Sequence, residues 1–147
     1  MSTVLIADND RAVSGLLTEV LARRGLRTAN AYDGTSAREL ALRLQPAVLV
    51  CDLDMPGLTG LEVIASLAEL AARPAVVVVS GYIDECTAAR LGELPYVRAV
   101  LKKPFDLLRF AAMVDELCRV GGNGAVADVA CQAELAADAA KNAPRRP

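Results

Sequence analysis

The 147-residue sequence contains no histidine, and aromatic residues make up only 3% of it. The absence of histidine excludes His general bases, Ser–His triads and most zinc sites. The scarcity of aromatic side chains argues against a surface on which nucleic-acid bases would stack. A formal net charge of −2 indicates no polybasic surface for nucleic acid or membrane. We therefore expect neither nucleic-acid binding nor membrane association.

The four cysteines are widely spaced and include no CxxC pair; they are Cys51, Cys86, Cys118 and Cys131. We interpret them as small apolar residues of a protein in a reducing cytoplasm. No apolar run approaches the roughly 18 residues of a membrane span. The first residues fit a strand followed by acids and not a secretory leader. Neither GxxxxGK[ST] nor GxGxxG occurs, which disfavours a nucleotide-binding protein.

Four short apolar runs, each followed by polar residues, have the pattern of buried parallel strands that open into loops. In an open α/β sheet, ligands bind beyond the carboxyl ends of the strands. Acids, a hydroxyl and a lysine should therefore meet at one edge, where they could hold a divalent cation and an oxyanion together. The segments that follow the four runs are Asp8-Asn9-Asp10, Asp52-Leu53-Asp54, Ser80-Gly81 and Lys102-Lys103-Pro104.

Amphipathic helical patterns alternate with these runs, and a more polar edge strand fits residues 26–30. The (βα)5 alternation predicts an α/β domain whose parallel sheet is covered by helices on both faces. After Gly121 the composition becomes rich in glycine and alanine, so we interpret residues 121–147 as a flexible tail that could contain one short helix. The predicted helices cover residues 13–21, 37–44, 61–70, 84–92 and 107–117.

Over about residues 2–120, these motifs together resemble the receiver domain of bacterial two-component response regulators. The resemblance combines an acidic cluster after the first strand, Asp-x-x-Met-Pro-Gly-x-x-Gly after the third, Ser-Gly after the fourth and Lys-Pro-Phe after the fifth. It implies that residues 1–120 form a flavodoxin-like (βα)5 receiver domain with strand order 2-1-3-4-5.

The resemblance implies that Asp52 is a phospho-acceptor. Its carboxylate would attack the phosphohistidine of a histidine kinase or histidine phosphotransfer protein, forming an acyl phosphate with Mg²⁺ as cofactor. Lys103 would supply a fixed positive charge to the phosphoryl oxygens, and Ser80 would donate its hydroxyl to them. The implied metal ligands are Asp52, the side chain of Asn9, the backbone carbonyl of Asp54 and, through water, Asp8.

Other residues near the strand ends have structural interpretations. We expect Asp10 to cap the following helix, Tyr82 to pack in its loop, and Pro104 to follow a cis peptide bond. Two residues depart from the family pattern. Asn9 stands where an acid usually ligates Mg²⁺, which predicts weaker Mg²⁺ binding, and Val100 stands where a switch Tyr or Phe is common.

The sequence therefore predicts a stand-alone response regulator in phosphorelay signalling, and not an enzyme beyond its own phosphorylation and dephosphorylation. No extension of helix-turn-helix size follows residue 120, so DNA binding is not expected. By resemblance, a downstream protein would bind the face formed by helix 4, strand 5 and helix 5. The sequence is also compatible with a homodimer.

Two alternative functions also fit part of the sequence. One is a phosphorylation-independent pseudo-receiver that acts as a protein-interaction module, which Asn9 and Val100 favour. The other is a haloacid-dehalogenase-like phosphatase with Asp52 as nucleophile and Asp54 as acid/base. That enzyme motif lies on a first strand and usually has Thr or Val where this chain has Pro56, so we disfavour it.

Overall fold

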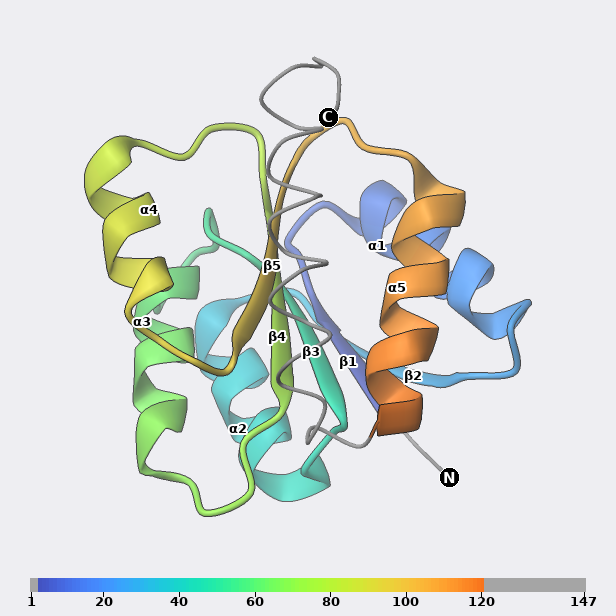
Figure 1. Ribbon diagram of the computed structural model, residues 1–147, viewed down its shortest axis with the longest axis horizontal. Coiled ribbons are helices and arrows are strands. Elements are labelled where there is room, and N and C mark those ends of the chain that lie inside the picture. Colours follow the sequence, from blue (N-terminus) through green and yellow to red (C-terminus); the bar gives the residue numbers. More distant parts are fainter. Residues whose placement is uncertain (1–2, 121–147) are drawn as a thin grey trace.

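A five-stranded parallel sheet with the strand order β2-β1-β3-β4-β5 runs through the computed structural model, which describes residues 3–120 (Figure 1). The predicted fold and strand order are thus confirmed, while the predicted tail lies outside the described residues. The strands are β1 (Thr3–Ala7), β2 (Arg27–Ala31), β3 (Val48–Asp52), β4 (Ala75–Ser80) and β5 (Val97–Lys102). The helices are α1 (Arg11–Ala22), α2 (Gly34–Leu44), α3 (Gly60–Ser66), α4 (Glu85–Gly92) and α5 (Leu107–Val120).

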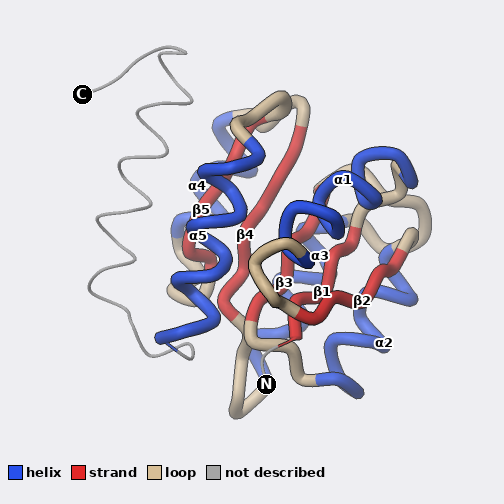
Figure 2. The backbone as a smooth tube through the Cα atoms, turned by 90° about the vertical axis from the view of Figure 1, so that its right-hand side faces the viewer, coloured by secondary structure: helices blue, strands red, loops and turns tan. Residues whose placement is uncertain are grey.

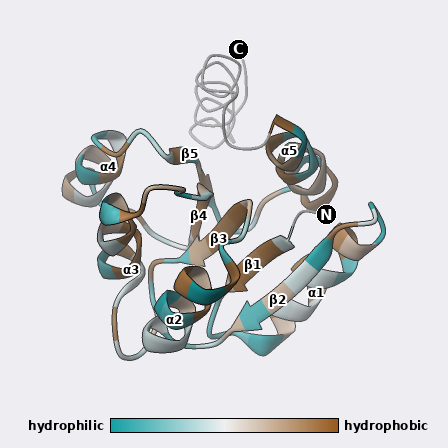
Figure 3. Ribbon diagram, turned by 90° about the horizontal axis from the view of Figure 1, so that it is seen from below, coloured by the Kyte–Doolittle hydropathy of each residue, from teal (hydrophilic) through white to brown (hydrophobic). Residues whose placement is uncertain are grey.

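Helices cover both faces of the sheet, which is why its central strands are apolar along their whole length. Val4 and Ile6 of β1 belong to the core beneath α1 and α5, whereas Leu5 and Ala7 belong to the core beneath α2, α3 and α4. Successive side chains of a strand point to opposite faces, so one run of residues supplies both cores. Figure 3 shows the hydrophobic colouring of β1, β3 and β4 between the helices.

The edge strand β2 is more polar and begins one residue later than the sequence predicted. It is joined to α1 partly by hydrogen bonds: the Asn30 side-chain amide donates to the Ser14 hydroxyl at 2.6 Å and to the Thr18 hydroxyl at 3.1 Å. Figure 2 shows β2 at the edge of the sheet, beside β1. These bonds satisfy polar groups that are partly buried between the strand and the helix.

The third helix is shorter than predicted, because α3 ends at Ser66 and a 3₁₀ turn follows over Leu67–Glu69. The Ser66 hydroxyl donates to the carbonyl of Val63 at 2.7 Å, a local bond that competes with regular helical pairing. The prediction of one helix over residues 61–70 was therefore wrong at its C-terminal end. A 3₁₀ turn is a frequent way for an α-helix to end.

The loop after β3 is fixed by two glycines of the Asp-x-x-Met-Pro-Gly-x-x-Gly motif. Gly57 has a φ of +79°, in the left-handed region that favours glycine. Gly60 lies against the strand end: its N–H donates to the Leu53 carbonyl at 3.0 Å, and a Cβ at this position would lie 2.2 Å from the Asp52 carbonyl oxygen. The motif thus holds the backbone that follows Asp52.

We expect Gly60→Ala to destabilise the protein by about 1–3 kcal/mol, because its methyl group would overlap the Asp52 backbone. Urea unfolding monitored by circular dichroism measures this change. Gly15→Ala is the matched control: Gly15 is an exposed residue inside α1 with open space around it, so that change should stabilise the protein by about 0.5–1 kcal/mol. Equal stability of the two variants would contradict this account of the motif.

Candidate functional site

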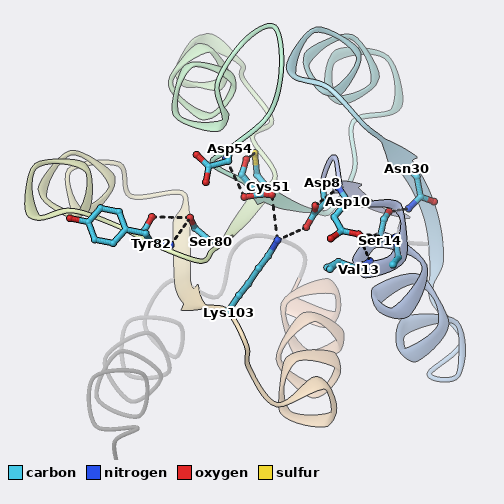
Figure 4. A network of polar contacts seen from close by, with 12 residues as sticks. Asp8, Asp10, Val13, Ser14, Asn30, Cys51, Asp54, Ser80, Tyr82 and Lys103 are labelled. Atoms are coloured by element: carbon cyan, nitrogen blue, oxygen red, sulfur yellow. Dashed lines mark hydrogen bonds and ion pairs between the residues drawn. The ribbon is translucent and has the colours of Figure 1, made fainter.

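Two buried carboxylates lie where the neighbouring strands β1 and β3 end: Asp8 directly follows β1, and Asp52 is the last residue of β3. Figure 4 shows Asp8 facing the ammonium of Lys103. Asp8 is 0% exposed and Asp52 is 5% exposed. Each accepts a hydrogen bond from the backbone two residues later: the N–H of Asp10 donates to Asp8 Oδ1 at 2.8 Å, and that of Asp54 donates to Asp52 Oδ1 at 3.1 Å. The loops therefore fix the direction in which both carboxylates point.

Lys103, which directly follows β5, bridges the two carboxylates. Its Nζ lies 2.9 Å from Asp8 Oδ2 and 3.4 Å from Asp52 Oδ2. The Lys103 N–H also donates to the Ser80 carbonyl at 2.8 Å, which ties the loop after β5 to β4. The bond between Lys103 and Pro104 is cis, as predicted. One ammonium thus neutralises part of the charge of two acids that are far apart in the sequence but close in the structure.

The electrostatics of this cluster change the pKa of two groups. Burial raises the pKa of Asp52 above its usual range; the Asp54 N–H opposes this, the charge of Asp8 adds to it, and Lys103 again opposes it. Burial by itself lowers the pKa of Lys103, but its hydrogen bond to Asp8 and the charges of both carboxylates outweigh that, so the pKa is raised. Lys103 is therefore a fixed cation at neutral pH.

Ser80 lies at the same edge, but its hydroxyl bonds to the loop after β4. The fully buried hydroxyl donates to the carbonyl of Tyr82 at 2.9 Å and accepts from the Tyr82 N–H at 3.3 Å. The Tyr82 side chain itself is 73% exposed. Our interpretation of Tyr82 as a packed loop residue was therefore wrong: its backbone anchors the loop, and its ring faces solvent.

The acidic cluster after β1 divides its roles among three residues. Asp8 is buried, Asn9 is exposed, and Asp10 caps α1 by accepting from the N–H groups of Ala12 and Val13, as predicted. No three acidic, His or Cys side chains gather as a metal site anywhere between residues 3 and 120. Two carboxylates with neighbouring amide and carbonyl oxygens nevertheless fit Mg²⁺, which is often held by one or two carboxylates and several waters.

Val100, at the predicted switch position, and the nearby Tyr96 belong to the core beneath α2, α3 and α4. Val100 is partly buried on β5, and Tyr96 is 7% exposed, with its hydroxyl donating to the Ile64 carbonyl at 2.7 Å. Tyr96 thus attaches the segment just before β5 to α3. Cys51, next to Asp52, is fully buried, and burial together with the charges of Asp52 and Asp8 raises the pKa of its thiol, so it is not a nucleophile.

One pair of residues beside the site was not predicted from the sequence. The guanidinium carbon of Arg11 lies 3.8 Å from the centroid of the Tyr32 ring. Arg11 directly follows the acidic cluster and Tyr32 directly follows β2, and this pair of positions was the only available sign. Their contact depends on β1 and β2 being neighbours, which a linear sequence does not show.

Residues 4–115 match the response regulator receiver domain family. The chain belongs to this family. The chain is 34% identical over 146 residues to protein-glutamate methylesterase/protein-glutamine glutaminase 5 of Myxococcus xanthus; the match covers 98% of this chain and 39% of that protein. It is 26% identical over 107 residues to sporulation initiation phosphotransferase F of Bacillus subtilis, covering 71% of this chain and 83% of that protein.

Solved structures agree with this assignment. The signal receiver domain of a response regulator from Bermanella marisrubri superposes with a TM-score of 0.70 at 30% sequence identity, covering 80% of this chain and 99% of that one. The chain spans only about two-fifths of the length of the methylesterase that it matches. Within residues 3–120, no helix has both the length and the apolar character needed to cross a membrane.

We expect Asp52→Asn to stabilise the receiver domain at pH 7 without Mg²⁺ by the order of 1 kcal/mol. The pKa of Asp52 is raised in the folded state, so its contribution to stability is present below the unfolded pKa of about 4 and is lost as pH rises through the folded pKa. Asparagine removes that loss. The difference from wild type should therefore shrink as pH falls toward 4, in thermal unfolding with EDTA.

Lys103→Met is the opposite test of the same cluster. It leaves two buried carboxylates without their cation and should destabilise the receiver domain by about 3 kcal/mol or more at pH 7. A result in which both variants lose stability at pH 7 would contradict the electrostatic account.

Proposed function

We propose that this receiver domain accepts a phosphoryl group on Asp52 from the phosphohistidine of a histidine kinase or phosphotransfer protein. The observation that carries the proposal is the Asp52 carboxylate at a strand end, 3.4 Å from the ammonium of Lys103 and beside the buried Asp8. A carboxylate held beside a fixed cation is suited to attack an anionic phosphorus centre, because the cation offsets the repulsion between them.

The transfer needs no general base, since the nucleophile is already ionised. One Asp52 oxygen forms a bond to phosphorus while the phosphorus–nitrogen bond of the phosphohistidine breaks, and the imidazole leaves with the electron pair. Lys103 then donates to the phosphoryl oxygens. The Ser80 hydroxyl can donate to them only by giving up its bond to the Tyr82 carbonyl, which lies 2.9 Å away in the unphosphorylated protein.

The donor set proposed for Mg²⁺ consists of Asp52, the side chain of Asn9 and the backbone carbonyl of Asp54, with Asp8 acting through water. When bound, Mg²⁺ would neutralise charge on the phosphoryl oxygens during transfer. Two carboxylates that already share one ammonium retain a net negative charge, so a divalent cation is attracted to them.

In signalling, we propose that residues 1–120 act as a stand-alone regulator whose phosphorylation changes the α4–β5–α5 face that a downstream protein binds. Family membership and the match to 83% of the length of sporulation initiation phosphotransferase F support this. The second candidate is a pseudo-receiver that binds partners without phosphorylation. It is favoured by the neutral, exposed Asn9 and by the partly buried Val100.

We expect acetyl phosphate with Mg²⁺ to add one phosphoryl group to the wild-type protein, and Asp52→Asn to abolish the adduct. Intact mass spectrometry measures this directly. Lys103→Met should slow adduct formation by about a hundredfold or more, as expected when a preorganised charge is removed from the transferring group. Asp115→Asn on α5, far along the chain from the strand ends, serves as the control and should react like wild type.

No adduct in the wild type, even with a phosphohistidine protein as donor and saturating Mg²⁺, would favour the pseudo-receiver. An adduct that survives Asp52→Asn would assign the reaction to another residue and contradict the proposal.

We expect Asn9→Asp to bind Mg²⁺ more tightly than wild type, by about threefold to tenfold. The added carboxylate attracts the cation, but its repulsion from Asp8 and Asp52 offsets much of that gain. Magnesium titration followed by NMR or calorimetry measures the difference, and equal affinities would contradict the hypothesis that Asn9 weakens the metal site.

A further inference from the structure

Arg11 is an exposed arginine whose position is fixed by an aromatic ring. It is the first residue of α1, and its guanidinium carbon lies 3.8 Å from the centroid of the Tyr32 ring. A guanidinium stacked on a ring keeps its edge free for hydrogen bonds while the ring limits its movement. Arg11 is thus held in place although it is on the surface.

The Arg11 guanidinium has no acceptor in the described part of the chain. The two arginines that directly follow α1 are ion-paired: Arg23 with Glu19 at 2.8 Å and Arg24 with Asp115 at 3.0 Å. Arg11 makes neither an ion pair nor a hydrogen bond within residues 3–120. Its N–H donors therefore face solvent, available to an external anion.

Arg11 lies near the ends of the strands that carry the acidic residues of the site. The Asp8 N–H donates to the Ala31 carbonyl at 3.1 Å, which places the following Tyr32 next to the acidic cluster. Arg11 follows Asp8 by three residues, so their Cα atoms are at most about 11 Å apart. That is close to the roughly 10 Å screening length at 0.1 M salt. The backbone of Arg11 is therefore close to the acidic cluster, on the side of β2.

Arg11 and Lys103 differ in what neutralises them. Lys103 reaches the acids from the β5 side and is bonded to both carboxylates. Arg11 lies on the β2 side of the edge, and the two acids next to the pair, Asp10 and Asp33, accept hydrogen bonds from the first turns of α1 and α2 and not from Arg11. The Arg11 guanidinium is thus a cation without an ion pair within residues 3–120, and it lies toward β2 while Lys103 reaches the acids from β5.

We propose that Arg11, held on Tyr32, binds the anionic phosphoryl group of the phosphodonor at the mouth of the site before transfer to Asp52. Guanidinium pairs with phosphate oxygens through two parallel hydrogen bonds. The inference rests on the proposed function and names a donor-binding residue for it. The same positive charge repels Mg²⁺, so Arg11 has opposite effects on the two ligands.

The test measures both ligands on the full chain carrying Arg11→Gln. With acetyl phosphate, the rate at low donor concentration should fall about threefold to tenfold at 50 mM salt, while the rate at saturating donor is unchanged. The deficit should shrink at 0.5 M salt, where the charge is screened. Mg²⁺ should bind the variant about twofold more tightly. Phosphoimidazole, which carries phosphorus on nitrogen as phosphohistidine does, should show the same loss.

Three control variants separate this role from a structural one. Arg23→Gln makes the same charge change at the other end of α1, on a side chain that is 75% exposed, and should leave both ligands unaffected. Tyr32→Phe keeps the stacking surface and should react like wild type. Tyr32→Leu keeps the charge of Arg11 but removes the ring on which its side chain stacks, so this variant should lose part of the donor binding.

Several results would overturn the inference. Donor dependence equal to wild type would remove the proposed role. Weaker Mg²⁺ binding together with a lower melting temperature would show that Arg11 only supports the fold. A loss of rate with acetyl phosphate but not with phosphoimidazole would show that Arg11 binds the acetyl group and not the phosphoryl group. If the wild type itself forms no adduct at Asp52, the proposed function fails and the inference fails with it, and the wild-type mass alone identifies that case.

Discussion

The site depends on one ammonium group shared by two buried carboxylates. Asp8 and Asp52 end adjacent strands, so the sheet itself forces their charges together. Lys103 makes that arrangement stable, and it does so across 95 and 51 residues of sequence. The cluster links the ends of β1, β3 and β5 into one unit. Because two acids share one cation, the unit keeps the negative charge that a divalent metal needs.

Around this cluster, the sheet supplies rigidity and the loops supply chemistry. Gly60 holds the backbone after Asp52 by packing without a side chain against it, and Lys103 holds the loop after β5 to the Ser80 carbonyl. The Ser80 hydroxyl bonds to the Tyr82 backbone. A phosphoryl group on Asp52 would compete for that single hydroxyl proton. Under the proposed function, the bonding of the loop before α4 therefore depends on whether Asp52 carries a phosphoryl group.

Much of the fold and the candidate site could be predicted because the determining signals are local. Short apolar runs made the strands visible, and the positions at or just beyond their ends contained Asp8, Asp52, Ser80 and Lys103. The strand order came from the family resemblance. The errors also had local causes: a Ser66 side-chain bond ends α3 early, and the backbone of Tyr82, not its ring, engages the loop. Each depends on which of several available hydrogen-bond partners a group takes.

The sequence by itself determined which residue types stand at the strand ends and that Asp10 caps a helix, since these follow from periodicity and chain geometry over a few residues. Only the tertiary structure decided that Lys103 bonds both carboxylates, that Ser80 bonds its own loop, and that Arg11 stacks on Tyr32. The physical reason is that these contacts join atoms brought together by sheet pairing and loop conformation, and the energies of competing partners differ by amounts that residue type does not encode.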